Sequence, residues 1–184
     1  MCGFSGREVQ PTSGDSLCCV RFGRKRGDAQ RTPEAEAYVG LRQQVLALRP
    51  DQLGLTSETP VLALLMETGY PEAVATLVGV IDGSTSLYFS NGGGIIGAGS
   101  HPEVASATGS WLQTSVDFLR HLSAVIEPPP PGEGLTQFMA VTPHGLLGAV
   151  ASEDDLGGGG HPLSPLFYSG QDVITQVRLA ETTS

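Results

Sequence analysis

The first regular pattern of apolar and polar positions begins with Thr32-Pro33-Glu34. A hydroxyl side chain followed by a proline and acidic residues is typical of a helix start. The hydroxyl caps a free backbone amide, and the acids interact favourably with the positive end of the helix dipole. Apolar side chains then recur at spacings of three and four, at Tyr38, Leu41, Val45 and Leu48. The pattern predicts one amphipathic helix, which Pro50 and Gly54 end.

Three short apolar segments follow, at 61–66, 74–81 and 85–90. The first could form a buried strand or a turn of helix, and its shortness favours a strand. Asp82-Gly83 separates the second and third segments, and glycine tolerates the positive φ of a tight turn, so we expect a hairpin there. Because side chains alternate along a strand, Tyr88 should face the side of the sheet opposite to Leu87.

The second half of the sequence continues with a helix, two strands and a final helix. The first of these helices begins near Pro102 and carries its apolar residues on one face. Strands are predicted over 135–142 and 146–151, because the residues between them are typical of a turn. Ser164 and the proline after it predict the start of the last helix.

Two segments between these elements are predicted to be loops. The proline-rich segment 127–134 should be a stiff, exposed linker, and a PxxP ligand for a partner protein is the alternative. The segment 152–160 should be a flexible acidic loop. Its acids could gather a divalent cation with His161, but they lack the spacing of a calcium loop, so no metal site is predicted at Glu153, Asp154 and Asp155.

The expected order is helix, three strands, helix, two strands, helix. Consecutive strands joined by tight turns pair antiparallel. The sequence therefore predicts one α+β domain over 32–184, with a single five-stranded, mainly antiparallel sheet flanked by about three helices.

Charge separates this body from the first 31 residues. Residues 1–31 hold six of the ten Lys and Arg residues against three acids, so we expect a basic, disordered tail. The remaining residues carry four arginines against sixteen Asp and Glu, a net charge of −12. Such a body repels phosphate groups, which argues against nucleic acid and against an anionic membrane as partners. No apolar run approaches the roughly 18 residues of a membrane span.

The cysteines are confined to the same tail, at Cys2, Cys18 and Cys19. They lack the spacing of a zinc site, and the body holds no cysteine for a disulfide framework. We interpret them as free thiols. The tail also lacks the apolar stretch of a secretory signal, so a cytoplasmic location is expected.

A glycine-rich segment before the second helix is the most unusual feature of the sequence. A strand, a glycine loop and a helix N-terminus together can present backbone amides to an anion, which predicts a small anionic ligand or a nucleotide. The alternative, which we favour, is that the glycines permit close packing or a protein contact, since no Lys-Ser/Thr follows and no βαβ unit precedes. The candidate ligand-binding residues are Asn91, Gly92, Gly93, Gly94, Gly97 and Gly99.

Candidates for catalysis are few. Ser90 and His101, with Asp82 or Asp117, are the nearest approach to a hydrolase arrangement. Ser90 does not stand in a G-x-S-x-G motif, so no nucleophile elbow is indicated. We therefore predict no catalytic residue and no cofactor, and an enzyme is the less favoured interpretation.

In the order of its elements the body resembles roadblock-type modules of the profilin-like class. The segment 87–99 also resembles part of small bacterial proteins without an assigned function. The first resemblance implies dimerisation and control of small GTPases or motors, without chemistry of its own. The resulting hypothesis is a non-catalytic regulatory or protein-interaction module that binds a protein partner or itself as a homodimer, and the alternative is a protein that binds a small anionic ligand.

Overall fold

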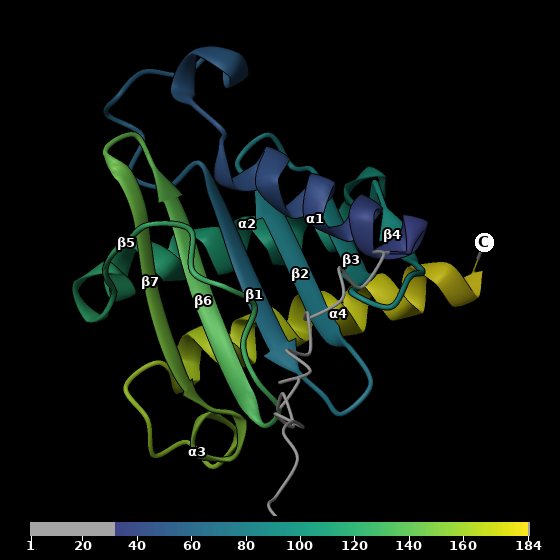
Figure 1. Ribbon diagram of the computed structural model, residues 1–184. Helices are drawn as coiled ribbons and strands as arrows, with labels where there is room; N and C mark the ends of the chain where they lie inside the picture. The colour runs from purple at the N-terminus through teal and green to yellow at the C-terminus, as the bar shows by residue number, and fades with distance from the viewer. Residues whose placement is uncertain (1–31, 184) are drawn as a thin grey trace, which may run out of the picture. The chain divides into compact units, whose positions relative to one another are not determined.

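The computed structural model describes residues 32–183, so the predicted tail and its cysteines lie outside the described residues. The strands form one antiparallel sheet in the order β4-β3-β2-β1-β6-β7-β5 (Figure 1). Their bounds are β1 Ala63–Gly69, β2 Val74–Val80, β3 Thr85–Phe89, β4 Gly94–Ile96, β5 Ser123–Val125, β6 Leu135–Thr142 and β7 Gly145–Ser152.

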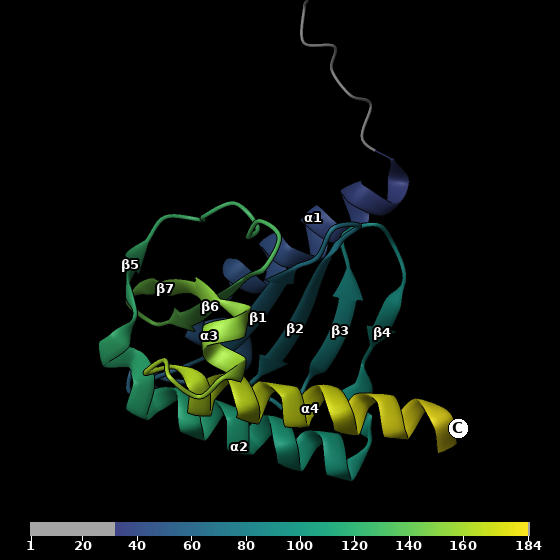
Figure 2. The same cartoon turned by 90° about the horizontal axis from the view of Figure 1, so that it is seen from below.

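Helices cover both faces of this sheet. Figure 2 shows α1 on one face, with α2 and α4 side by side on the other. The α-helices are α1 Pro33–Leu46, α2 Pro102–Phe118, α3 Glu153–Gly157 and α4 Ser164–Thr183, and short 3₁₀ turns span Pro50–Leu53, Ala98–Ser100 and Leu119–His121. We call the two sides of the sheet the α1 face and the α2/α4 face.

The α+β class and the single antiparallel sheet agree with the prediction, but the predicted counts of five strands and about three helices are wrong. The described residues form seven strands and four α-helices. The additional strands, β4 and β5, are three-residue edge strands, too short to show an alternating pattern. The additional helix, α3, lies in the predicted acidic loop, where the Ser152 hydroxyl accepts a hydrogen bond from the Asp155 amide and caps the helix.

The start of α1 confirms the prediction, but its end and its buried face differ. The Thr32 hydroxyl accepts a hydrogen bond from the Ala35 amide, and the helix ends at Leu46 instead of continuing to Pro50. The buried residues are Tyr38, Arg42 and Leu46, so a charged side chain occupies the centre of the buried stripe.

The β2–β3 hairpin forms at Asp82-Gly83 as predicted. Gly83 has a φ of 90°, and the Asp82 carboxylate accepts a hydrogen bond of 2.8 Å from the Ser84 amide. The predicted strand over 135–142 is β6, and the strand predicted over 146–151 is one residue longer at each end as β7.

The proline-rich segment is mostly exposed, as predicted, but hydrogen bonds also tie it to α1 and to β1. It passes over the α1 face of β6 and β7 (Figures 1 and 2). The Pro128 carbonyl accepts a hydrogen bond of 2.8 Å from Arg42, and the Gly134 amide donates to the Gly69 carbonyl at 2.9 Å. A side chain at Gly69 would collide with the backbone of Gly132, so glycine permits this approach.

Candidate functional site

A row of polar side chains crosses the sheet beneath α1. Tyr88, Thr76, Glu67 and Gln137 occupy paired positions on β3, β2, β1 and β6. All are buried, and Glu67 and Thr76 are fully inaccessible to solvent. Buried polar groups need hydrogen-bond partners, so the side chains of α1 that pack above this row must help to supply them.

Glu67 is the centre of a hydrogen-bond network. The Arg42 Nε and Nη2 atoms donate to its two carboxylate oxygens at 2.8 and 3.0 Å. Three further donors are the Tyr38 hydroxyl at 3.2 Å, the Thr76 hydroxyl at 3.3 Å and the Gln137 amide at 3.2 Å. The carboxylate is thus paired with one cation and saturated with donors.

This network affects the ionisation of its neighbours. Burial, followed by the charge of Glu67, raises the pKa of Tyr38 to about 12. Burial alone would lower the pKa of the Arg42 guanidinium, but the hydrogen bond and the charge of Glu67 outweigh it and raise that pKa. Both groups therefore keep their protons at neutral pH.

Tyr88 is the exception within the row. Its hydroxyl is the one buried side-chain polar atom of the described residues that has no hydrogen-bond partner. Burial raises its pKa, with the charge of Glu67 as the second cause, so the hydroxyl lies close to the network without being bonded to it. An unpaired buried hydroxyl costs stability.

A pocket of about 330 Å³ opens between α1 and the β3–β4 hairpin. One side is the face of α1 that carries positions 34, 37, 38 and 41, which share one side of a helix. The other side is the hairpin. The lining residues are Glu34, Ala37, Tyr38, Leu41, Tyr88, Phe89, Gly92, Gly93, Gly94 and Ile96.

The three glycines of the pocket shape its hairpin wall. A Cβ atom on Gly94 would lie 2.5 Å from the Leu87 carbonyl oxygen, so only glycine allows the backbone to lie so close to β3. A Cβ atom on Gly92 would lie 3.0 Å from the Glu34 Cγ atom, whereas Gly93 faces open space. Close packing, which the sequence offered as one interpretation of the glycines, therefore applies to Gly94, and also to Gly99, where a Cβ atom would collide with the Gly83 carbonyl.

The candidate ligand-binding residues fall in two places. Gly92, Gly93 and Gly94 line the pocket, and Asn91 precedes them without lining it. Gly97 and Gly99 line a separate depression of about 250 Å³ together with the turn of the β2–β3 hairpin. Strand β4 begins at Gly94 and ends at Ile96, so the glycines do not form one continuous loop.

The charge of the pocket is negative. Glu34 is its single charged lining residue, and hydrogen bonds from its own backbone amide and from the Thr32 hydroxyl lower its pKa. Glu34 is therefore ionised at neutral pH, and no basic side chain lines the pocket to balance it. This charge opposes an anion.

Two of the residues considered for hydrolysis, Ser90 and Asp82, bind nearby backbone amides. The Ser90 hydroxyl accepts a hydrogen bond of 2.8 Å from the Val74 amide, and His101 stands at the N-cap position of α2. The Asp82 carboxylate caps the hairpin turn. Within the described residues no hydrogen bond joins Ser90 to His101, and Asp117 is exposed on α2.

Two side chains of the acidic segment and its neighbourhood, Glu153 and His161, accept hydrogen bonds within the protein. Glu153 accepts a hydrogen bond of 3.0 Å from the Tyr70 hydroxyl, and the His161 Nδ1 atom accepts one of 3.1 Å from the Leu163 amide. Residues 32–183 contain no group of three or more His, Cys, Asp or Glu side chains arranged to hold a metal ion.

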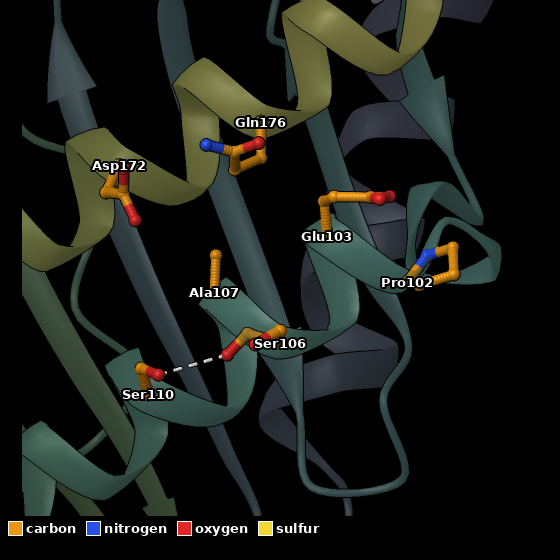
Figure 3. A pocket seen from close by; sticks show the side chains of 7 residues that line it. All are labelled: Pro102, Glu103, Ser106, Ala107, Ser110, Asp172 and Gln176. Carbon is orange, nitrogen blue, oxygen red and sulfur yellow. Dashed lines mark hydrogen bonds between the residues drawn. The ribbon is translucent and has the colours of Figure 1, made fainter.

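A second, larger groove of about 460 Å³ lies between α2 and α4. Figure 3 shows the carboxylates of Glu103 and Asp172, one from each helix, with Gln176 beside them. The Ser110 hydroxyl donates to the Ser106 carbonyl of its own helix at 3.1 Å, so its proton is already used within the helix. The groove offers two carboxylates, one amide and two serine hydroxyls, and among the described residues no hydrogen bond joins either serine to a carboxylate.

Comparison with known proteins leaves the family open: no family model, no curated protein and no solved structure matches the chain. The helices of the described residues include none with the length and apolar character needed to cross a membrane.

Proposed function

We propose that the chain is a non-catalytic interaction module of the regulatory kind that the roadblock-type resemblance implies, and that its partner binds in the pocket between α1 and the β3–β4 hairpin. The supporting observation is the contrast between an open, largely apolar pocket and the saturated network below it. A general acid or base must exchange a proton with its ligand. Glu67, the buried carboxylate nearest the pocket floor, is instead held by five hydrogen bonds.

An array of short basic, neutral and acidic peptides tests this function. Ala37 is exposed and lines the pocket, so Ala37→Leu fills it without disturbing the helix. Gln44→Leu adds the same side chain to an exposed position of α1 outside the pocket. We expect the full chain to bind a subset of peptides, Ala37→Leu to lose them and Gln44→Leu to keep them. Binding that survives Ala37→Leu, or no binding at all, would contradict the proposal.

The same proposal includes a homodimer, because the resemblance implies dimerisation. The two edge strands are only three residues long, which limits pairing at the sheet edges and favours contact through a helix. Sedimentation equilibrium of the full chain should give twice the monomer mass of 19.1 kDa. A monomer at every accessible concentration counts against this part of the proposal.

A cytoplasmic location is also part of the proposal. It is supported by the absence of cysteine from residues 32–184, which therefore need no oxidising compartment to form disulfides. Cell fractionation that follows the full chain with an antibody should find it with cytoplasmic markers, and recovery with secreted proteins would overturn this expectation.

A further inference from the structure

The rim of the pocket carries one charge. Glu34 lies in the first turn of α1, fully exposed, and its side chain approaches Gly92 of the hairpin. A carboxylate in this position attracts a cationic group that enters between helix and hairpin. The remaining lining residues are uncharged.

The floor of the pocket is aromatic. The rings of Tyr38 and Tyr88 meet edge to face with centroids 5.7 Å apart, and both residues line the pocket. Aromatic rings attract cations through the negative charge on their faces. Leu41 and Ile96 add apolar walls, against which an aliphatic stem can pack.

The net charge of the domain also favours a cationic group in the pocket. Residues 32–184 carry a net charge of −12, from four arginines against sixteen acids. Of these arginines, Arg42 is buried and paired with Glu67, so it does not present its charge to the pocket. The field around the domain therefore favours the approach of a positively charged partner.

We propose that this pocket receives one basic side chain, a lysine or an arginine, from a protein partner. The charged head lies near Glu34, and the stem lies between Leu41 and Ile96. A volume of about 330 Å³ suits a single long side chain. The inference rests on the proposed function of the pocket as the partner's binding site and specifies the chemistry of that partner.

Three blocked tripeptides test the inference, with arginine, citrulline or glutamate between two leucines. Citrulline has nearly the shape of arginine without its charge. We expect the arginine peptide to shift the amide resonances of 92–94 and of the lining residues of α1 in NMR titrations of the full chain. Its affinity should exceed that of the citrulline peptide by roughly five- to tenfold.

Two variants in the same turn of α1 provide the matched control. Glu34→Gln should remove most of the preference for arginine over citrulline, whereas Glu36→Gln, exposed but outside the pocket, should retain it. If arginine and citrulline bind the pocket equally, the inference fails and the proposed function stands. If the glutamate peptide binds most tightly, the anionic alternative replaces the inference. If no peptide maps to the pocket, both the inference and the proposed site fail.

Discussion

The two faces of the sheet are stabilised by different kinds of interaction. The α2/α4 face is packed with large apolar side chains, among them Leu64, Trp111 and Phe138, all fully buried. The α1 face also has an apolar core, but the buried pair of Arg42 and Glu67 lies within it. Alternation along β1 is enough to separate the two, because Leu64 and Met66 face one side while Glu67 faces the other.

This difference determines how each face tolerates change. Apolar packing loses stability in proportion to the side chain removed. A buried ion pair gains little over an apolar pair of the same shape, but it is costly when one member is lost, because a charge is left without a partner. The stability of the α1 face therefore depends on the charged and polar groups that cover it, whereas the stability of the α2/α4 face depends mainly on side-chain volume.

Removal of Arg42 should have the largest effect. Arg42→Met leaves Glu67 buried without its cation, so we expect the free energy of unfolding, measured by urea denaturation, to fall by about 4 kcal/mol. The double variant Arg42→Met/Glu67→Leu removes both charges and should recover part of the loss, because Tyr38, Thr76 and Gln137 then lose their acceptor. A single variant that loses less than about 1 kcal/mol would show that the pair does not control this face.

The apolar face should respond slightly less. Leu64→Ala deletes a fully buried side chain and should lower the free energy of unfolding by about 3 kcal/mol. In the double variant Arg42→Met/Leu64→Ala, the two losses of unfolding free energy should add to within roughly 0.5 kcal/mol, because the two side chains lie on opposite faces. A strongly non-additive double variant would mean that the faces are coupled through β1.

The two tyrosines of the α1 face offer a smaller and more specific contrast. Tyr38→Phe removes a hydroxyl bonded to Glu67 and should cost about 1 kcal/mol in thermal or urea unfolding. Tyr88→Phe removes a buried hydroxyl without a partner and should leave stability unchanged or raise it by up to about 1 kcal/mol. Equal losses would indicate that the Tyr88 hydroxyl is bonded in solution.

The smallest expected effect is on the free energy of unfolding at alkaline pH. An unfolded tyrosine ionises near pH 10, whereas the pKa of Tyr38 in the folded protein is raised to about 12. Between these values the unfolded chain releases a proton that the folded protein keeps, so the free energy of unfolding should fall as pH rises from 10 to 12. Tyr38→Phe should make this decline shallower, and an unchanged decline would contradict the assignment to Tyr38.

The sequence predicted what depends on periodicity and turns. The β2–β3 hairpin follows from Asp82-Gly83 between two apolar runs, and the start of α1 follows from Thr32 and the proline after it. Strands β4 and β5 could not be predicted, because three residues show no period and both exist only by pairing with a neighbour.

The candidate site was only partly predictable. Glycines at 92–94 do line a pocket. Its acidic and part of its aromatic character come from residues 34–41 of α1, which lie more than fifty residues earlier in the chain. Two signals could have indicated the network: Glu67 directly follows an apolar run, and Arg42 stands four residues after Tyr38 on the same helix face. Their pairing depends on tertiary contact, which no local pattern contains.

The contact of the proline-rich segment with Arg42 links two distant parts of the chain. One guanidinium nitrogen donates both to Glu67 on the sheet and to the carbonyl of Pro128, a residue 86 positions away. If α1 lifts from the sheet, that segment loses its anchor at the same moment. In native-state hydrogen exchange the helix and the loop should therefore open together as one cooperative unit, although no strand joins them.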